Sequence, residues 1–319
     1  MADAPMSSDP RANCQAEPGT GRMPPPIPRE PATPWGFWAT VGLGLAIAAG
    51  SFVAQAVIGV IYAVVAMAAG GSIGDPEGLE SDGFFLALAT IGGGVVGVGL
   101  VILVSTLRRS MNVREYLGLH MPPLRATLGW IGIFLVAVAI GDTLTYFIGK
   151  DIVPDFMIDI DATARFRPLL WFTLIIMAPL FEESFFRGFL IPGFAKSPVK
   201  APGAILLTSA LWTIIHFQYE AFHMGVIFVA GILLGIVRIK TGSLILCILL
   251  HMLMNTVATV ELEIYKAMRS PATAAASCNS SLIHLFNSQY FEDFEDAASL
   301  GVTGVRSVGG DDDVAPILQ

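Results

Sequence analysis

Long apolar runs dominate this chain and limit what it can fold into. A helix needs about 20 apolar residues to cross the hydrocarbon core of a bilayer, and lipid offers the backbone no hydrogen-bonding partners. Hydrophobic residues make up 54% of the 319 residues and charged residues only 14%, against roughly 25% charged in a soluble domain. We therefore predict an all-α fold, a polytopic transmembrane helix bundle of about seven spans, near residues 36–68, 83–106, 127–149, 168–191, 202–218, 223–238 and 242–261.

The two ends of the chain differ in composition from this apolar middle. Residues 1–34 contain repeated prolines and almost no periodicity, so we interpret them as a disordered, Pro-rich N-terminal tail. Residues 270–319 are small and polar and end in acidic residues, so we predict a largely disordered C-terminal tail. The sequence thus predicts a transmembrane helical domain over residues 35–269 between two polar tails.

Cysteine usage and charge exclude several classes of protein. Cys14, Cys247 and Cys278 are scattered, which argues against a disulfide framework and against a thiolate metal site. The net charge is −8 and no basic stripe is present, so we expect no nucleic-acid partner. The lipid bilayer is the partner that the composition itself implies.

Charges in the loops between the apolar runs alternate in sign and predict a topology. The loops after the second, fourth and sixth runs carry lysine and arginine, namely Arg108, Arg109, Arg114, Arg125, Lys196, Lys200, Arg238 and Lys240. The loops after the first and third runs are rich in aspartate and glutamate. Lysine and arginine favour the cytoplasmic side. We therefore expect an integral membrane protein with a cytoplasmic N-terminus and its C-terminal tail outside.

Three ionisable side chains lie close together inside the run near 168–191. One such side chain at the bilayer centre costs about 2.5–3.5 kcal/mol, so Glu182, Glu183 and Arg187 are expected to pair, to line a wet cavity or to do chemistry. Glu183 and Arg187 are four residues apart with the acid first, the favoured order for an ion pair on a helix. Glu182 points elsewhere on the helix and is left in an apolar setting suited to a general base.

Two later apolar runs contribute further polar pairs at helical spacing. Trp212 and His216 are four residues apart, as are His251 and Asn255. A histidine can share a water molecule with Glu182, and a histidine with an asparagine makes a pair of donors for a developing oxyanion. A base, a water molecule and oxyanion donors are the parts needed to hydrolyse an amide without a covalent intermediate.

These residues resemble the motifs of the CAAX protease and bacteriocin-processing family, also called the Abi family, of integral membrane proteins. The family carries Glu-Glu-x-x-x-Arg, then Phe-x-x-x-His, then His-x-x-x-Asn or His-x-x-x-Asp, on successive core helices. Here the motifs read Glu182-Glu183-Ser184-Phe185-Phe186-Arg187, Trp212-Thr213-Ile214-Ile215-His216 and His251-Met252-Leu253-Met254-Asn255. The resemblance covers roughly residues 168–260, the predicted catalytic core, and departs from the family in having tryptophan rather than phenylalanine before the histidine.

The resemblance implies an intramembrane endopeptidase of the CAAX prenyl protease type, in a bacterial plasma (inner) membrane. Its substrate would be a peptide or a membrane-anchored protein, cleaved by glutamate-activated water. The catalytic residues that it implies, as base, assisting histidine and oxyanion donors, are Glu182, His216, His251 and Asn255. The residues that would organise the site are Glu183, Arg187 and Trp212.

Other interpretations remain open at the level of the sequence. We expect no cofactor, but zinc is possible, since Glu182, His216 and His251 could form a three-ligand site with an open position although no His-Glu-x-x-His motif is present. A non-catalytic membrane scaffold or a bacteriocin-immunity-type protein is the alternative from another class. A transporter is a weaker alternative, because no internal repeat is evident.

Overall fold

The structure, a computed structural model, describes residues 33–69 and 81–269 of the chain. The chain divides into two compact units, Met1–Thr33 and Pro34–Gln319, and every element described below belongs to the second. The C-terminal tail predicted over 270–319, and nearly all of the N-terminal tail predicted over 1–34, lie outside the described residues.

All regular secondary structure in the described part of the chain is helical. The elements in chain order are α1 (Phe37–Ala68), α3 (Gly83–Leu107), α4 (Val113–Leu117), α5 (Leu124–Phe147), α6 (Asp155–Thr163), α7 (Arg167–Phe172), η1 (Thr173–Met177), α8 (Ala178–Glu183), η2 (Ser184–Leu190), α9 (Ile191–Ala195), α10 (Lys200–Ile214), α11 (Ala221–Thr241) and α12 (Leu244–Arg269). The segments α7 to α9 follow one another directly and form one continuous helix, the central helix, over Arg167–Ala195.

The predicted fold class is confirmed. By length and composition, six helices in the described ranges can cross a membrane: α1, α3, α5, the central helix, α11 and α12. The remaining predicted span, 202–218, corresponds to α10, which has 15 residues and is therefore shorter than the about 20 residues of a full crossing. Two short helices, α4 and α6, lie in the connections before and after α5.

The central helix contains two π-helical segments, and proline explains both. The segment η1 ends directly before α8, whose first turn holds Pro179. The segment η2 ends directly before α9, whose first turn holds Pro192. Proline has no N–H and its ring clashes with the carbonyl of the preceding turn, and local widening to a π-helix accommodates this. Both π segments leave backbone carbonyls that side chains of other helices reach, as described below.

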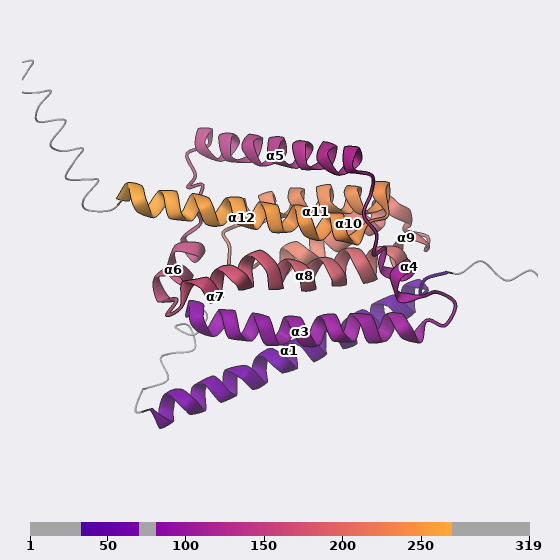
Figure 1. The fold of residues 1–319 in the computed structure, drawn as a ribbon, viewed down its shortest axis with the longest axis horizontal. Helices are drawn as coiled ribbons and strands as arrows, with labels where there is room; N and C mark the ends of the chain where they lie inside the picture. Colours follow the sequence, from indigo (N-terminus) through magenta and orange to yellow (C-terminus); the bar gives the residue numbers. More distant parts are fainter. Residues whose placement is uncertain (1–32, 70–80, 270–319) are drawn as a thin grey trace, which may run out of the picture. The chain divides into compact units, whose positions relative to one another are not determined.

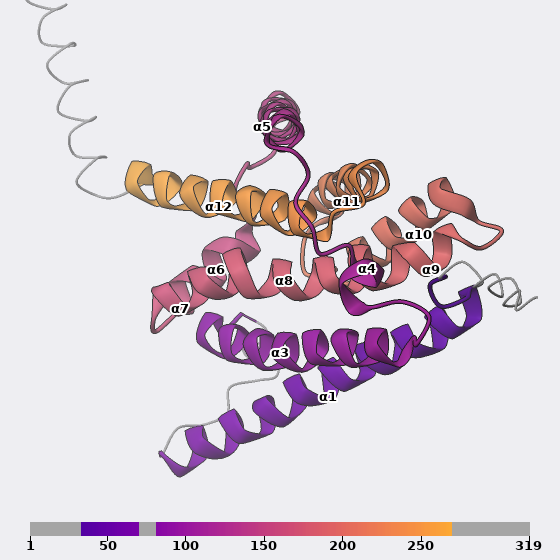
Figure 2. The same ribbon diagram turned by 45° about the vertical axis from the view of Figure 1, so that its right-hand side comes forward.

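The central helix lies between α3 on one side and α12 on the other, and both views show this order (Figures 1 and 2). On the far side of α3, α1 packs along it, and α5 lies outermost beyond α12. Close packing on α3 depends on Gly97, where an added Cβ would lie 2.2 Å from the ring of Phe181. The buried core surrounds the second half of the central helix, and Phe189 and Trp212 are among its largest side chains.

The loops rich in basic residues gather at one end of the bundle. The backbone N–H of Leu244 donates to the carbonyl of Gly118 at 3.0 Å, which joins the α3–α5 connection to the α11–α12 turn. At the opposite end, Lys150 pairs with Glu220 at 3.0 Å and joins the α5–α6 loop to the α10–α11 loop. The α3–α5 connection and the α11–α12 turn, which both carry basic residues, thus lie at the same end of the bundle.

Candidate active site

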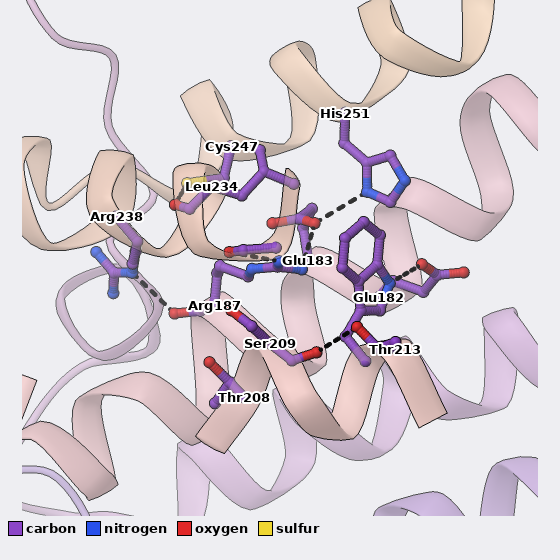
Figure 3. Close-up of polar contacts among 12 residues, drawn as sticks. Glu182, Glu183, Arg187, Thr208, Ser209, Thr213, Leu234, Arg238, Cys247 and His251 are labelled. Atoms are coloured by element: carbon purple, nitrogen blue, oxygen red, sulfur yellow. Dashed lines mark hydrogen bonds and ion pairs between the residues drawn. The ribbon is translucent and has the colours of Figure 1, made fainter. Parts of the chain in front are cut away.

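The polar side chains predicted from the sequence come together where three helices meet. The central helix supplies the two glutamates and the arginine, α10 supplies Trp212, with His216 just beyond its end, and α12 supplies His251. In Figure 3 the carboxylate of Glu183 lies between Arg187 and His251, and Glu182 points away from that pair. Six of the seven predicted site residues are therefore linked through direct contacts, and Asn255 is the exception.

Glu183 is the centre of a fully buried ion pair. Its Oε1 accepts from Nη1 of Arg187 at 2.7 Å, and neither side chain is exposed to solvent. The same oxygen accepts from Nδ1 of His251 at 2.9 Å. The predicted Glu183–Arg187 pairing is present, and His251 joins it from another helix. A buried charge is tolerated when it is paired in this way.

Arg187 has further partners on two other helices. Its Nη2 donates to the carbonyl of Gly231 on α11 at 3.2 Å, and its guanidinium carbon lies 4.6 Å from the centre of the Trp212 ring. The backbone carbonyl of Arg187, within the π segment η2, accepts from Nε of the buried Arg238 at 2.9 Å. Arg187 thus connects the central helix with α10 and α11.

Glu182 has a different environment, although it is the next residue in the chain. It is only partly buried, and its Oε2 accepts from the indole N–H of Trp212 at 2.5 Å. Among the described residues, its Oε1 has no hydrogen-bond partner. The hydrogen bond from Trp212 therefore fixes one carboxylate oxygen of Glu182 and leaves the other available to a water molecule or a substrate.

His216, like Glu182, contacts Trp212. Its Nδ1 lies 2.7 Å from the carbonyl oxygen of Trp212, and its ring lies edge-on to the indole at 5.2 Å. A carbonyl oxygen only accepts, so Nδ1 carries the proton and donates it. In the neutral imidazole this leaves the lone pair on Nε2, which can accept from water.

Asn255 is engaged away from the other site residues. Its Nδ2 donates to the carbonyl of Leu174 in the π segment η1 at 2.7 Å. His251 and Asn255, which the sequence predicted as a pair of oxyanion donors, therefore have different partners in the structure, because the carbonyl of Leu174 accepts from the Asn255 amide. One N–H of the amide group remains for another acceptor.

Tyr219 is a further residue at the site that the sequence motifs did not single out. Its ring lies 6.1 Å from that of His216 and 5.2 Å from that of Phe156 on α6. Burial, and secondarily the carboxylate of Glu182, raise the pKa of Tyr219, which keeps the phenol protonated. The only sequence signal was an aromatic residue three positions after a motif histidine, which occurs too often by chance to select it.

A three-ligand zinc site does not fit this arrangement. In the described part of the chain, no group of three or more histidine, cysteine, aspartate or glutamate side chains is placed to hold a metal ion. We therefore derive no chemical step through a metal.

Comparison with known proteins gives the site a family context. Residues 164–257 match the family of type II CAAX prenyl endopeptidases described as Rce1-like. The chain is also 31% identical over 126 residues to an uncharacterized 24.3 kDa protein of Escherichia coli, an alignment that covers 39% of this chain and 54% of that protein. The chain thus spans about half the length of that curated relative. No solved structure matches this chain.

The family match and the fold support the same conclusion about where the protein resides. Six apolar helices and a match to a family of membrane proteases support an integral membrane protein. The matched residues include all three motifs, from Glu182 to Asn255. The resemblance that the motifs predicted is thus confirmed, in that residues 164–257 match the type II CAAX prenyl endopeptidase Rce1-like family.

Proposed function

We propose that this protein is an intramembrane endopeptidase of the CAAX-processing type, in which Glu182 activates the water that cleaves a peptide bond. The observation that carries the proposal is the division of labour between two adjacent carboxylates. Glu183 is fully buried and neutralised by Arg187, whereas Glu182 is partly exposed and keeps one oxygen open. A purely structural cluster needs no second carboxylate with an open oxygen beside two histidines.

In the proposed reaction, Oε1 of Glu182 takes a proton from water as the water oxygen bonds to the carbonyl carbon of the substrate. His216 orients the same water through Nε2, which the Trp212 carbonyl leaves free by engaging Nδ1. The tetrahedral intermediate then collapses, the carbon–nitrogen bond breaks, and Glu182 returns the proton to the leaving amine. No covalent link to the protein forms at any stage.

The developing oxyanion needs donors close to Glu182. His251 is held through Nδ1 by Glu183, so that in its doubly protonated form it donates from Nε2. Asn255 can contribute the amide N–H that Leu174 does not occupy. The role of Glu183 and Arg187 is to fix these groups, and preorganised donors of this kind supply much of the rate enhancement in acyl transfer.

The substrate that suits this site is a peptide or a protein anchored in the same membrane. Glu182 lies within a helix long and apolar enough to span a bilayer, so a substrate reaches it most directly from the membrane phase. We further propose a bacterial inner-membrane location with the basic end of the bundle in the cytoplasm, as loop charge favours. A reporter fused after residue 269 tests this orientation, and activity of a cytoplasm-dependent reporter would contradict it.

The decisive experiment is peptide cleavage by the purified protein in lipid vesicles. The substrates are a mixed peptide library and membrane-anchored peptides, with and without a prenyl group. Wild type is compared with Glu182→Gln, and with Glu115→Gln as a matched control, because Glu115 is an exposed glutamate on α4. We expect cleavage by wild type and by the control variant and none by Glu182→Gln.

A chelator arm separates the water-activation mechanism from a metal-dependent one. Cleavage that persists in the presence of a strong zinc chelator supports glutamate-activated water. Cleavage that chelation abolishes and added zinc restores would overturn this mechanism while keeping the protease. Full activity of Glu182→Gln would overturn the assignment of the base.

A further inference from the structure

We propose that Trp212 is a positioning residue for the reaction, which holds Oε2 of Glu182 through its indole N–H and so presents Oε1 to water. The catalytic part of this inference depends on the proposed function. The hydrogen bond itself does not, and it can be tested without any substrate. From the sequence, Trp212 was predicted only as one of the residues that would organise the site, with no partner assigned to it.

Trp212 is buried, and this burial determines what its indole N–H needs. The side chain is 1% exposed, and a buried indole N–H requires an acceptor. Glu182 supplies that acceptor from a different helix, at 2.5 Å. The bond therefore joins α10 to the central helix at the residue proposed as the base. A hydrogen bond to a charged acceptor is stronger than one between neutral groups.

The indole is itself held on several sides, so its N–H has a fixed direction. The guanidinium of Arg187 lies over its face at 4.6 Å. The rings of His216 and His251 lie nearly perpendicular to it, both with centroids at 5.2 Å. Trp212 thus contacts four other site residues, namely Glu182, Arg187, His216 and His251. A displacement of its ring would therefore change the surroundings of all four.

Space for the indole is provided by a glycine on the neighbouring helix. A Cβ at Gly231 would lie 3.0 Å from Cε3 of Trp212 and 3.1 Å from Cβ of Ser209. The same glycine accepts from Arg187 through its carbonyl. The packing around Trp212 is therefore built from the backbone of α11 as well as from side chains.

The chemistry of the indole decides what this contact does. An indole nitrogen only donates, so it holds Oε2 as an acceptor and takes no part in proton transfer. Oε1 of Glu182, which has no hydrogen bond among the described residues, is then the oxygen that meets water. Phenylalanine at this position would keep an aromatic ring but lose the donor. Such a change should therefore slow the chemical step more than it weakens substrate binding.

The first test observes the hydrogen bond directly in the full-length protein in lipid nanodiscs. The chain has five tryptophans, so selective ¹⁵N labelling gives few indole N–H resonances, and Trp212→Phe identifies the one from Trp212. Glu182→Gln should move that resonance upfield, since a neutral amide accepts more weakly than a carboxylate. Glu115→Gln should leave it in place. A Trp212 resonance that does not respond to Glu182→Gln would overturn the proposal.

The second test is the steady-state kinetics of Trp212→Phe. We expect kcat to fall about 10- to 100-fold, as for loss of a hydrogen bond to a charged group, with KM changed by less than about threefold. Trp171→Phe is the matched control, because Trp171 lies in the central helix and its buried indole N–H has no hydrogen-bond partner among the described residues. An unchanged kcat in Trp212→Phe, or a loss that appears only in KM, would overturn the positioning role.

The two tests also separate this inference from the proposed function. If wild type cleaves no substrate, the proposed function fails, while the indole resonance still decides whether Trp212 holds Glu182. If wild type cleaves and the resonance does not respond, the proposed function stands and this inference fails. If Trp212→Phe does not fold, single Trp→Phe variants at the other four tryptophans assign the Trp212 resonance by exclusion, and the Glu182→Gln measurement, which keeps the indole, then decides.

Discussion

Glu182 and Glu183 are neighbours in the chain, yet their carboxylates have no hydrogen-bonding partner in common among the described residues. Glu182 accepts from Trp212 on α10, and Glu183 accepts from Arg187 and from His251 on α12. Successive residues on a helix point about 100° apart, so each glutamate faces a different neighbouring helix. Mutation of Glu183 is therefore expected to affect mainly stability, and mutation of Glu182 mainly activity.

Removing Arg187 should destabilise the protein strongly. Arg187→Met leaves the carboxylate of Glu183 buried without its cation, and breaking a buried pair costs about 3–5 kcal/mol. Thermal unfolding in detergent or nanodiscs measures the loss. The control is Lys150→Met, which breaks the exposed pair with Glu220, where little or no loss of stability is expected because solvent screens the two charges. Equal losses of stability in the two variants would show that the buried pair contributes no more to stability than the exposed pair.

Adding one methyl group at Gly231 should impair activity. The new Cβ would press on Trp212 and Ser209 at 3.0–3.1 Å, and a small misplacement at a reacting centre reduces rates by up to about 100-fold. Gly225→Ala in the same helix is the matched control, because nothing lies within 4 Å of its added Cβ.

Peptide cleavage and thermal unfolding are measured for both glycine variants. We expect Gly225→Ala to retain activity and to gain stability, since alanine is favoured over glycine in a helix by about 0.5–1 kcal/mol. A Gly231→Ala protein with wild-type kcat would contradict the tight packing of the indole.

Asn255→Ala should lower stability as well as activity. Its amide donates to the carbonyl of the partly buried Leu174, and loss of such a hydrogen bond costs about 0.5–1.5 kcal/mol. The free energy of unfolding of Asn255→Ala is compared with that of Thr256→Ala, an adjacent residue whose hydroxyl bonds only within its own helix. If Asn255→Ala loses activity but no stability, its main role is at the oxyanion rather than at the π segment η1.

The ring of Tyr219 should matter more than its hydroxyl. Tyr219→Phe keeps the packing between His216 and Phe156, so we expect kcat/KM within about threefold of wild type, whereas Tyr219→Ala should lose about tenfold or more as His216 loses support. Tyr146→Ala, at a tyrosine that is 70% exposed, serves as the control. A Tyr219→Phe protein as inactive as Tyr219→Ala would show that the hydroxyl takes part in catalysis.

The pH profile gives a second check on Tyr219. Its pKa is raised above the ordinary value of about 10, and a raised pKa keeps the neutral phenol at every pH below that value. Tyr219→Phe should therefore leave the profile of kcat/KM unchanged between about pH 6 and pH 9. A limb of the profile in that range that disappears with Tyr219→Phe would contradict the raised pKa.

Much of this protein follows from the local pattern of its sequence. Runs of apolar residues near the length of a bilayer crossing predict helices, because lipid forces the backbone to satisfy its own hydrogen bonds. The pairing of Glu183 with Arg187 follows from their spacing of four residues on one helix. These features depend on contacts within one segment, which a sequence displays directly.

Contacts between segments were decided only by the tertiary structure. The spacing of His251 and Asn255 did not indicate that one would join Glu183 and the other a carbonyl of η1, because the distance and rotation between two helices set which acceptor is nearest. The hydrogen bond that Trp212 donates to Glu182 likewise depends on how α10 packs beside the central helix. The sequence by itself thus determined the helices and the chemical groups they carry, and helix packing decided which of those groups meet.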